Sequence, residues 1–220
     1  MTAILMVLFM VVAVLFITLV LTVINILQRG YWKWNGKTIQ EILGVSPDKA
    51  GGKDIDKLPK HLVMQLFYAS PAPELGSMNG EYKARGLSVG SQAYVADFIT
   101  NHFFGPGRWQ GKAFYPFDKE KGSGYNIFKK NDKDGNPIIS RTRRMNTHIG
   151  ISVYDDRNSF RVDYSLYNGD LLVHSMRDEI RKINDKLYIG MGYMALGGGS
   201  VNPAPFILYG EPEKWVGPDT

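Results

Sequence analysis

The 220-residue sequence contains no cysteine, so no disulfide bond holds this protein together. Thiolate metal ligands and cysteine nucleophiles are excluded for the same reason. The four histidines show no local metal-ligand spacing: His61, His102, His148 and His174. A zinc site would need histidines brought together from distant segments, whereas haem on a single axial histidine is an alternative that the sequence leaves open. No nucleophile–base motif is present. We therefore expect no metal, no cofactor and a non-enzymatic role.

Charge is absent from residues 3–27, where only Thr18, Thr22 and Asn25 interrupt an apolar run. About 20 apolar residues in a helix cross the hydrocarbon core of a bilayer, so the run predicts a transmembrane helix. A cleaved signal peptide is the alternative. It would have basic residues before the apolar run and an Ala-x-Ala cleavage site after it, and neither is present. We predict an uncleaved anchor over residues 1–30.

Aromatic and basic residues follow the apolar run directly, a pattern typical of a membrane–water boundary. We predict that five residues lie at this interface: Arg29, Tyr31, Trp32, Lys33 and Trp34. The excess of positive charge on this side of the run indicates that the rest of the chain is cytoplasmic, with the anchor in the cell inner membrane. A domain on the other side of the membrane is the alternative.

The sequence has no run of lysines and arginines of the kind that binds nucleic acid. Its net charge of +5 lies beyond the anchor, with acidic residues interspersed throughout. A basic surface beside an anionic leaflet gains roughly 1 kcal/mol per nearby basic residue. The lipid bilayer, and no nucleic acid, is therefore the predicted partner of the charged surface.

A linker over residues 31–76 is predicted to connect the anchor to the next domain. It contains two short helices, at residues 38–43 and 58–68. Thr38 and Glu41 form a capping box at the start of the first helix. Residues 213–220 form a tail.

Residues 77–212 are predicted to form a β-barrel domain. Short segments rich in aromatic and β-branched residues alternate with turn residues, and one further helix is predicted at residues 91–104. The predicted strands are 80–85, 109–117, 124–129, 138–145, 148–154, 160–166, 171–181, 187–194 and 206–209. Mixed polarity on both faces favours a barrel over a sandwich. The predicted fold is mainly β: an antiparallel lipocalin-like barrel after a single transmembrane helix, with one or two short helices.

Residues 107–111 read Gly-Arg-Trp-Gln-Gly, followed by a lysine and an aromatic residue. Downstream lie Gly-Tyr-Asn at 124–126, Asp-Tyr at 163–164 and Arg-Asp-Glu at 177–179. Together these motifs resemble an uncharacterised bacterial family of GxWxG-motif, lipocalin-like (calycin-type) domains. The resemblance implies a barrel and an apolar ligand, but no reaction.

Charged and aromatic residues on the predicted strands supply a candidate ligand site. Arg143 or Arg177 would hold an acidic head group, because guanidinium groups pair with carboxylates and phosphates. Aromatic side chains would pack against an apolar body. The predicted ligand-binding residues are Trp109, Tyr125, Arg143, Asp163, Arg177 and Glu179. The alternatives are an exposed basic strand and cross-strand ion pairs that fix the register.

Two functions remain open at this stage. The first is a membrane-anchored barrel that binds an apolar or amphipathic, lipid-like small molecule. The second is a non-catalytic accessory or assembly subunit of a larger complex, whose partners are other membrane subunits. An enzyme that uses a carboxylate pair for acid–base chemistry is a third, less favoured reading.

Overall fold

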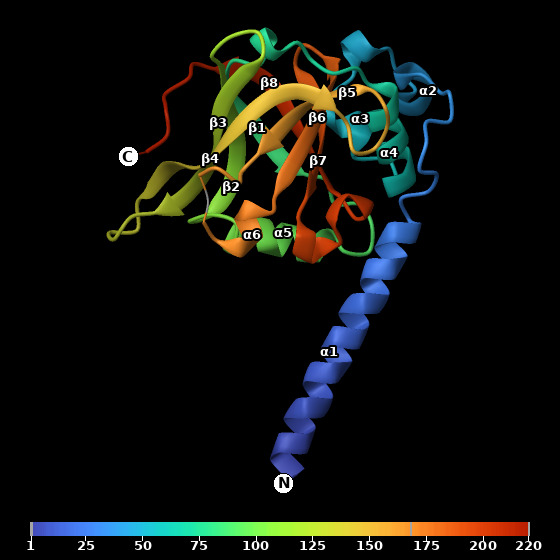
Figure 1. The fold of residues 1–220 in the computed structure, drawn as a ribbon, viewed down its shortest axis with the longest axis vertical. Coiled ribbons are helices and arrows are strands. Elements are labelled where there is room, and N and C mark those ends of the chain that lie inside the picture. Colours follow the sequence, from blue (N-terminus) through green and yellow to red (C-terminus); the bar gives the residue numbers. More distant parts are fainter. Residues whose placement is uncertain (1, 168, 220) are drawn as a thin grey trace.

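The computed structural model describes residues 2–167 and 169–219. A long helix, α1 (Thr2–Leu27), projects from a domain built around a single β-barrel (Figure 1). Residues 3–27 of α1 are long and apolar enough to cross a membrane, and their side chains are largely exposed. The mainly β fold with an N-terminal apolar helix is confirmed.

Eight antiparallel strands close the barrel in chain order, and β1 pairs with β8. The strands are β1 Gly80–Gly86, β2 Arg108–Pro116, β3 Lys121–Asn131, β4 Pro137–Ile151, β5 Asn158–Asp163, β6 Arg177–Asn184, β7 Leu187–Tyr193 and β8 Ala204–Glu213. Closure leaves neither edge of the sheet unpaired, which removes the main aggregation hazard of an open sheet.

Apart from shifts of a few residues at strand ends, the predicted strands differ from the observed ones in two places. Residues 138–145 and 148–154 were expected as two strands, but Asn146 and Thr147 pair with both β3 and β5, so β4 runs through the expected break. Residues 171–174 were expected in a strand, but they form α6 (Leu171–His174). The Asp170 carboxylate caps α6 by accepting a hydrogen bond from the Val173 N–H.

The segment predicted as a linker packs against the outside of the barrel. It forms α2 (Ile39–Leu43), η1 (Pro47–Lys49), α3 (Gly52–Ile55), α4 (Lys60–Ala69) and η2 (Leu75–Ser77). The predicted capping box starts α2, and Gly44 ends it at a positive φ of 73°. Phe67 of α4 shares a buried apolar cluster with Ile189 of β7 and Ile207 of β8. This segment is therefore part of the folded domain.

The remaining helices gather at one end of the barrel, here called the helical end. This end is covered by α5 (Ala93–His102), α6, η3 (Ala195–Gly197) and η4 (Gly199–Val201). It lies on the side toward which α1 projects (Figure 1). The opposite end carries the β2–β3 turn, where the Phe117 N–H donates to the Lys121 carbonyl.

Side chains fill the interior of the barrel. The interior cluster is mostly aromatic and includes Phe104, Phe114, Phe128, Phe160 and Tyr188. Two hollows lie on the outside of the described part of the domain, one beside α4 and one beside the C-terminal segment. Large buried side chains therefore occupy the described interior of the barrel.

Candidate functional site

A polar network lies inside the barrel at its helical end. It joins Trp109 and Lys112 of β2, Asn126 of β3, Tyr164 just after β5, and Asp178 of β6. Each of these side chains is buried. Three strands of the barrel wall and the residue that follows β5 are therefore tied together through one buried cluster.

Lys112 is the centre of this network. Its ammonium Nζ lies 2.7 Å from Asp178 Oδ2, and it donates to Asn126 Oδ1 at 3.0 Å and to the Tyr164 hydroxyl at 2.5 Å. The Tyr164 hydroxyl donates in turn to Asp178 Oδ2 at 2.8 Å. The Trp109 indole N–H donates to Asn126 Oδ1 at 3.0 Å. An ammonium group has three donors, and all three have partners here.

A β-bulge in β2 brings Trp109 and Lys112 to the same face. Trp109 pairs with Phe128 and Gly111 pairs with Ile127, so Gln110 is the extra residue. Without the bulge, residues 109 and 112 would point to opposite faces. Gly111 also approaches the neighbouring strand closely, since a Cβ there would lie 2.2 Å from the Tyr82 carbonyl oxygen. The Gly-Arg-Trp-Gln-Gly segment therefore shapes the polar network.

A second bulge lies in β4, the strand next to Asn126 of β3. Gly124 pairs with Met145 but Asn126 pairs with Thr142, so β4 has an extra residue here. Arg143 lies in this bulge with φ of 57°, an uncommon value for a non-glycine residue. Its carbonyl accepts a hydrogen bond from Asn126 Nδ2 at 3.3 Å. The strained backbone thus supplies an acceptor to the network.

Electrostatics and burial oppose each other at Lys112. Burial lowers the pKa of its ammonium group, and the Asp178 carboxylate acts against that change. Burial, reinforced by Asp178, raises the pKa of the Tyr164 hydroxyl well above its ordinary value. Four aromatic rings, those of Phe104, Trp109, Tyr164 and Phe206, surround Nζ at 5.2–6.0 Å. Because its groups bond mainly to one another, the network is suited to holding strands together.

The six residues predicted to bind a ligand lie on both sides of the barrel wall. Trp109 points inward, whereas Tyr125 packs outside against Trp215 and donates to Glu81. Arg143 bonds to the Phe104 carbonyl at 2.7 Å and to Asp170 at 2.6 Å, at the helical end.

The three remaining residues of that predicted set belong to the outer face. Asp163 and Arg177 form an ion pair at 3.3 Å, and the buried Glu179 accepts from the Val153 N–H at 2.9 Å. The structure therefore does not bring the six residues together in one site. The cross-strand ion pair of Asp163 and Arg177 follows the register-fixing alternative.

Sequence reasoning missed Lys112, Asn126, Tyr164 and Asp178. Asn126, Tyr164 and Asp178 are each one residue from a predicted site residue. Side chains alternate between faces along a strand, so a one-residue error places the prediction on the wrong face. The missed signal was the inward lysine two residues before Phe114, which requires a buried acidic partner.

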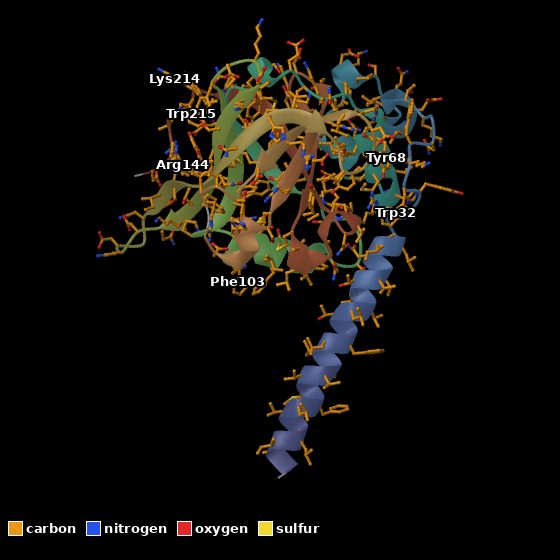
Figure 2. All side chains as sticks on the ribbon, in the orientation of Figure 1. Trp32, Tyr68, Phe103, Arg144, Lys214 and Trp215 are labelled. Carbon is orange, nitrogen blue, oxygen red and sulfur yellow. The ribbon has the colours of Figure 1, made fainter. Side chains whose placement is uncertain are left out.

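The junction between α1 and the barrel is a second polar region. Arg29, which was predicted to lie at the membrane interface, is only 2% exposed. Its guanidinium donates to the Ser200 carbonyl at 3.0 Å and to the Tyr68 hydroxyl at 3.1 Å, and lies over the Trp32 ring at 4.0 Å. Figure 2 shows Trp32 and Tyr68 at this junction. The other four predicted interface residues are exposed: Tyr31, Trp32, Lys33 and Trp34.

Polar side chains connect the last turns of α1 to the helical end, and we call these contacts the collar. Asn25 Nδ2 donates to Asn202 Oδ1 at 2.6 Å, and Asn202 Nδ2 donates to Gln92 Oε1 at 2.8 Å. Gln92 Nε2 donates to the Thr22 hydroxyl at 2.6 Å, and the Ser91 hydroxyl donates to the Leu21 carbonyl at 2.9 Å. The polar residues that interrupt the apolar run at positions 22 and 25 therefore serve this attachment.

Behind the collar, α4 covers a buried polar layer on the outer face of β6. Arg181 forms an ion pair with Asp155, at 2.5 Å between Nη2 and Oδ1. Among the described residues, four buried atoms in this layer have no hydrogen-bond partner: Arg29 Nε, Tyr154 OH, Glu179 Oε2 and Arg181 Nε. Burial raises the pKa of Tyr154 well above its ordinary value, so this hydroxyl stays protonated.

No protein-family model and no curated protein matches the chain. One solved structure, described as a protein from Thermomonospora curvata, is similar to it with a TM-score of 0.44 and 14% sequence identity. The match covers 75% of this chain and 90% of that one.

Proposed function

We propose that this is a single-pass membrane protein in which α1 crosses the bilayer and the barrel is a non-catalytic accessory module of a membrane assembly. The collar is the observation that carries this proposal. A signal peptide that is removed has no use for specific contacts with the mature domain, whereas Thr22, Asn25 and Arg29 make such contacts. The collar therefore favours an uncleaved anchor.

Two further features support an accessory role. The first is that α1 is apolar and exposed around its circumference before the collar, so lipid or other membrane helices must cover it. The second is the filled interior of the barrel, which leaves the outer surface to make functional contacts. We also propose that the barrel is cytoplasmic, following the excess of positive charge after α1.

Binding of an amphipathic small molecule is the second candidate function. The observation that favours it is the position of the polar network, which lies directly beneath Phe104 at the helical end and is lined by aromatic rings. A ligand would have to displace the Phe104 ring to reach Lys112 and Asp178. The resemblance to the GxWxG-motif domains supports this second candidate, because it implies an apolar ligand.

Native mass spectrometry of the full-length protein, extracted gently from its own membrane, tests these proposals. Release together with other membrane proteins at fixed stoichiometry supports the accessory role. A monomer that carries a lipid-sized mass supports the ligand-binding role, and Phe104→Ala should then change the amount of ligand retained. A mass that lacks the first 30 or so residues contradicts the anchor, and a bare monomer contradicts both functions.

The predicted orientation has a separate test, which the cysteine-free sequence makes simple. Lys133→Cys introduces the chain's single thiol on an exposed turn. A membrane-impermeant thiol reagent should label it in inverted membrane vesicles and leave it unlabelled in intact cells. The reverse pattern contradicts a cytoplasmic barrel.

A further inference from the structure

The helix α5 turns its apolar side away from the protein. Tyr94 is 91% exposed, Phe98 52% and Phe103, just after the helix, 62%. No residue of α5 is buried. The rings of Phe98 and Phe103 contact each other at 5.7 Å between centroids, so they form one apolar surface. In a water-soluble protein this side of an amphipathic helix would face the core.

A second segment extends this apolar surface. Leu196 in η3 is 82% exposed, and Val201 in η4 is also exposed. The two segments are linked, because Asn202 donates from Nδ2 to Gln92 Oε1 immediately before α5 and to the Gly197 carbonyl. Figure 1 shows α5 and the 195–201 segment side by side at the helical end, and Figure 2 places Phe103 there.

The collar fixes the level of this surface along α1. Ser91 and Gln92 contact α1 at Leu21 and Thr22, which is before the end of the helix at Leu27. Residues 3–22 of α1, about 20 residues at about 1.5 Å each, already span the roughly 30 Å of a hydrocarbon core. The chain that leads into α5 therefore lies level with the boundary between hydrocarbon and head groups.

We propose that the helical end of the barrel is a membrane-contact surface, in which the apolar side of α5 and the 195–201 segment insert into the head-group region of the bilayer. The proposal rests on the proposed function, since it requires α1 to span the membrane. The occupant of the surface is lipid, because the collar holds the surface at the level along α1 where the hydrocarbon core meets the head groups. Aromatic side chains are also the residues that favour the interface.

This arrangement places neighbouring residues in two different environments. Phe103 points outward to the lipid, whereas Phe104 points inward against Phe128 and Tyr164 of the barrel interior. The Phe104 carbonyl accepts a hydrogen bond from Arg143 Nε. The membrane-contact surface is thus joined to the polar network through two consecutive residues.

Single-cysteine labelling of the full-length chain in phosphatidylcholine–phosphatidylglycerol vesicles tests the proposal. Four variants carry an environment-sensitive fluorophore: Phe103→Cys, Leu196→Cys, Phe117→Cys and Val12→Cys. Phe117 is the matched control, because it is 61% exposed at the opposite end of the barrel. Val12 reports whether α1 is inserted. Quenching is measured with lipids that carry a spin label either near the head group or near the end of the acyl chain.

The expected result is strong quenching of the labels at positions 103 and 196 by the shallow spin label, with none at position 117. The label at position 12 should be quenched best by the deep spin label. If positions 103 and 196 behave like 117 while 12 is quenched, the membrane-contact surface is wrong and the anchor stands. If position 12 is unquenched as well, the proposed function itself fails.

Discussion

The barrel interior and the helical end each place residues where a water-soluble domain would avoid them. Inside, a lysine and an aspartate are fully buried, and at the helical end aromatic side chains are exposed. The buried charges are compensated within the chain, because the Lys112 ammonium has three polar partners. The exposed aromatic side chains are covered by no other part of the described residues. The interior is complete by itself, whereas the helical end requires an apolar environment.

The largest expected effect comes from breaking the network inside the barrel. Lys112→Met leaves Asp178 buried without its cation, which should lower the free energy of unfolding by about 3–5 kcal/mol. Lys112→Met combined with Asp178→Leu should recover most of that loss, because no charge is then left unpaired. Denaturant unfolding in mild detergent measures both. Lys186→Met, which removes an exposed ion pair, is the control. A double variant as unstable as the single one would contradict this account.

Phe104 and Phe103 allow a direct comparison of the barrel interior with the surface of the helical end, because they are consecutive residues with the same side chain. Phe104→Ala removes a buried ring and should cost about 3–5 kcal/mol of unfolding free energy. Phe103→Ala should change the unfolding free energy in detergent by less than about 0.5 kcal/mol, since its ring is exposed. Thermal unfolding of both variants checks this. Equal destabilisation would show that Phe103 also packs in the core.

Asn202 is the central residue of the collar, with partners on α1 and on the segment before α5. Asn202→Ala should cost about 1–3 kcal/mol, since it leaves part-buried polar groups of Asn25 and Gln92 unpaired. Hydrogen exchange should accelerate at residues 90–92 and 199–201. Asn131→Ala, at an exposed position of β3, is the control. Unchanged exchange at both segments would mean that the collar does not couple α1 to the barrel.

Lys60, which donates to Asn202 of the collar, should make the free energy of unfolding depend on pH. Burial, with Arg29 as a second cause, lowers the pKa of its ammonium group to about 8, below the unfolded value of about 10.4. Below pH 8 the buried Lys60 ammonium group is charged and lowers the free energy of unfolding. This cost disappears as the pH rises from about 8 to about 10.4, because the group loses its proton in the folded state first. Lys60→Met should stabilise the protein by about 1–3 kcal/mol at pH 7.

The stabilisation by Lys60→Met should shrink across that same pH range. The free energies of unfolding of the wild type and the variant are measured at several pH values between 7 and 10.5, and their difference is compared across that range. The exposed Lys57 supplies the control variant, Lys57→Met. A stabilisation that stays constant with pH would contradict a depressed pKa at Lys60.

The sequence predicted the barrel because the relevant signals are local. The capping box at Thr38, the strands and the helix near residues 93–102 all follow from short patterns of residues. The two bulges and the α6 turn did not follow, because a bulge depends on how two strands pair and one inserted residue reverses the faces beyond it. Asp163 was predicted for the site in place of its neighbour Tyr164 for another reason: β5 pairs without a bulge, and alternation along one strand does not say which of its two faces lines the interior.

The orientation of α5 was equally beyond the sequence. The apolar side with Tyr94 and Phe98 predicts an amphipathic helix, but that pattern is the same whether the apolar side meets a core or a membrane. Only the collar, with contacts from Ser91 and Gln92 to α1, orients this side. Arg29 was assigned to the interface for a similar reason, because its charge gives no sign of the carbonyls that bind it.

Neutron reflectometry of the full-length protein in a supported bilayer tests the central claim, that α1 and the barrel form one unit whose helical end lies on the membrane. The density profile along the membrane normal distinguishes protein, head groups and water. The account predicts protein density that continues from the hydrocarbon core through the head groups into the barrel without a water layer. A hydrated gap between the head groups and the barrel would contradict it.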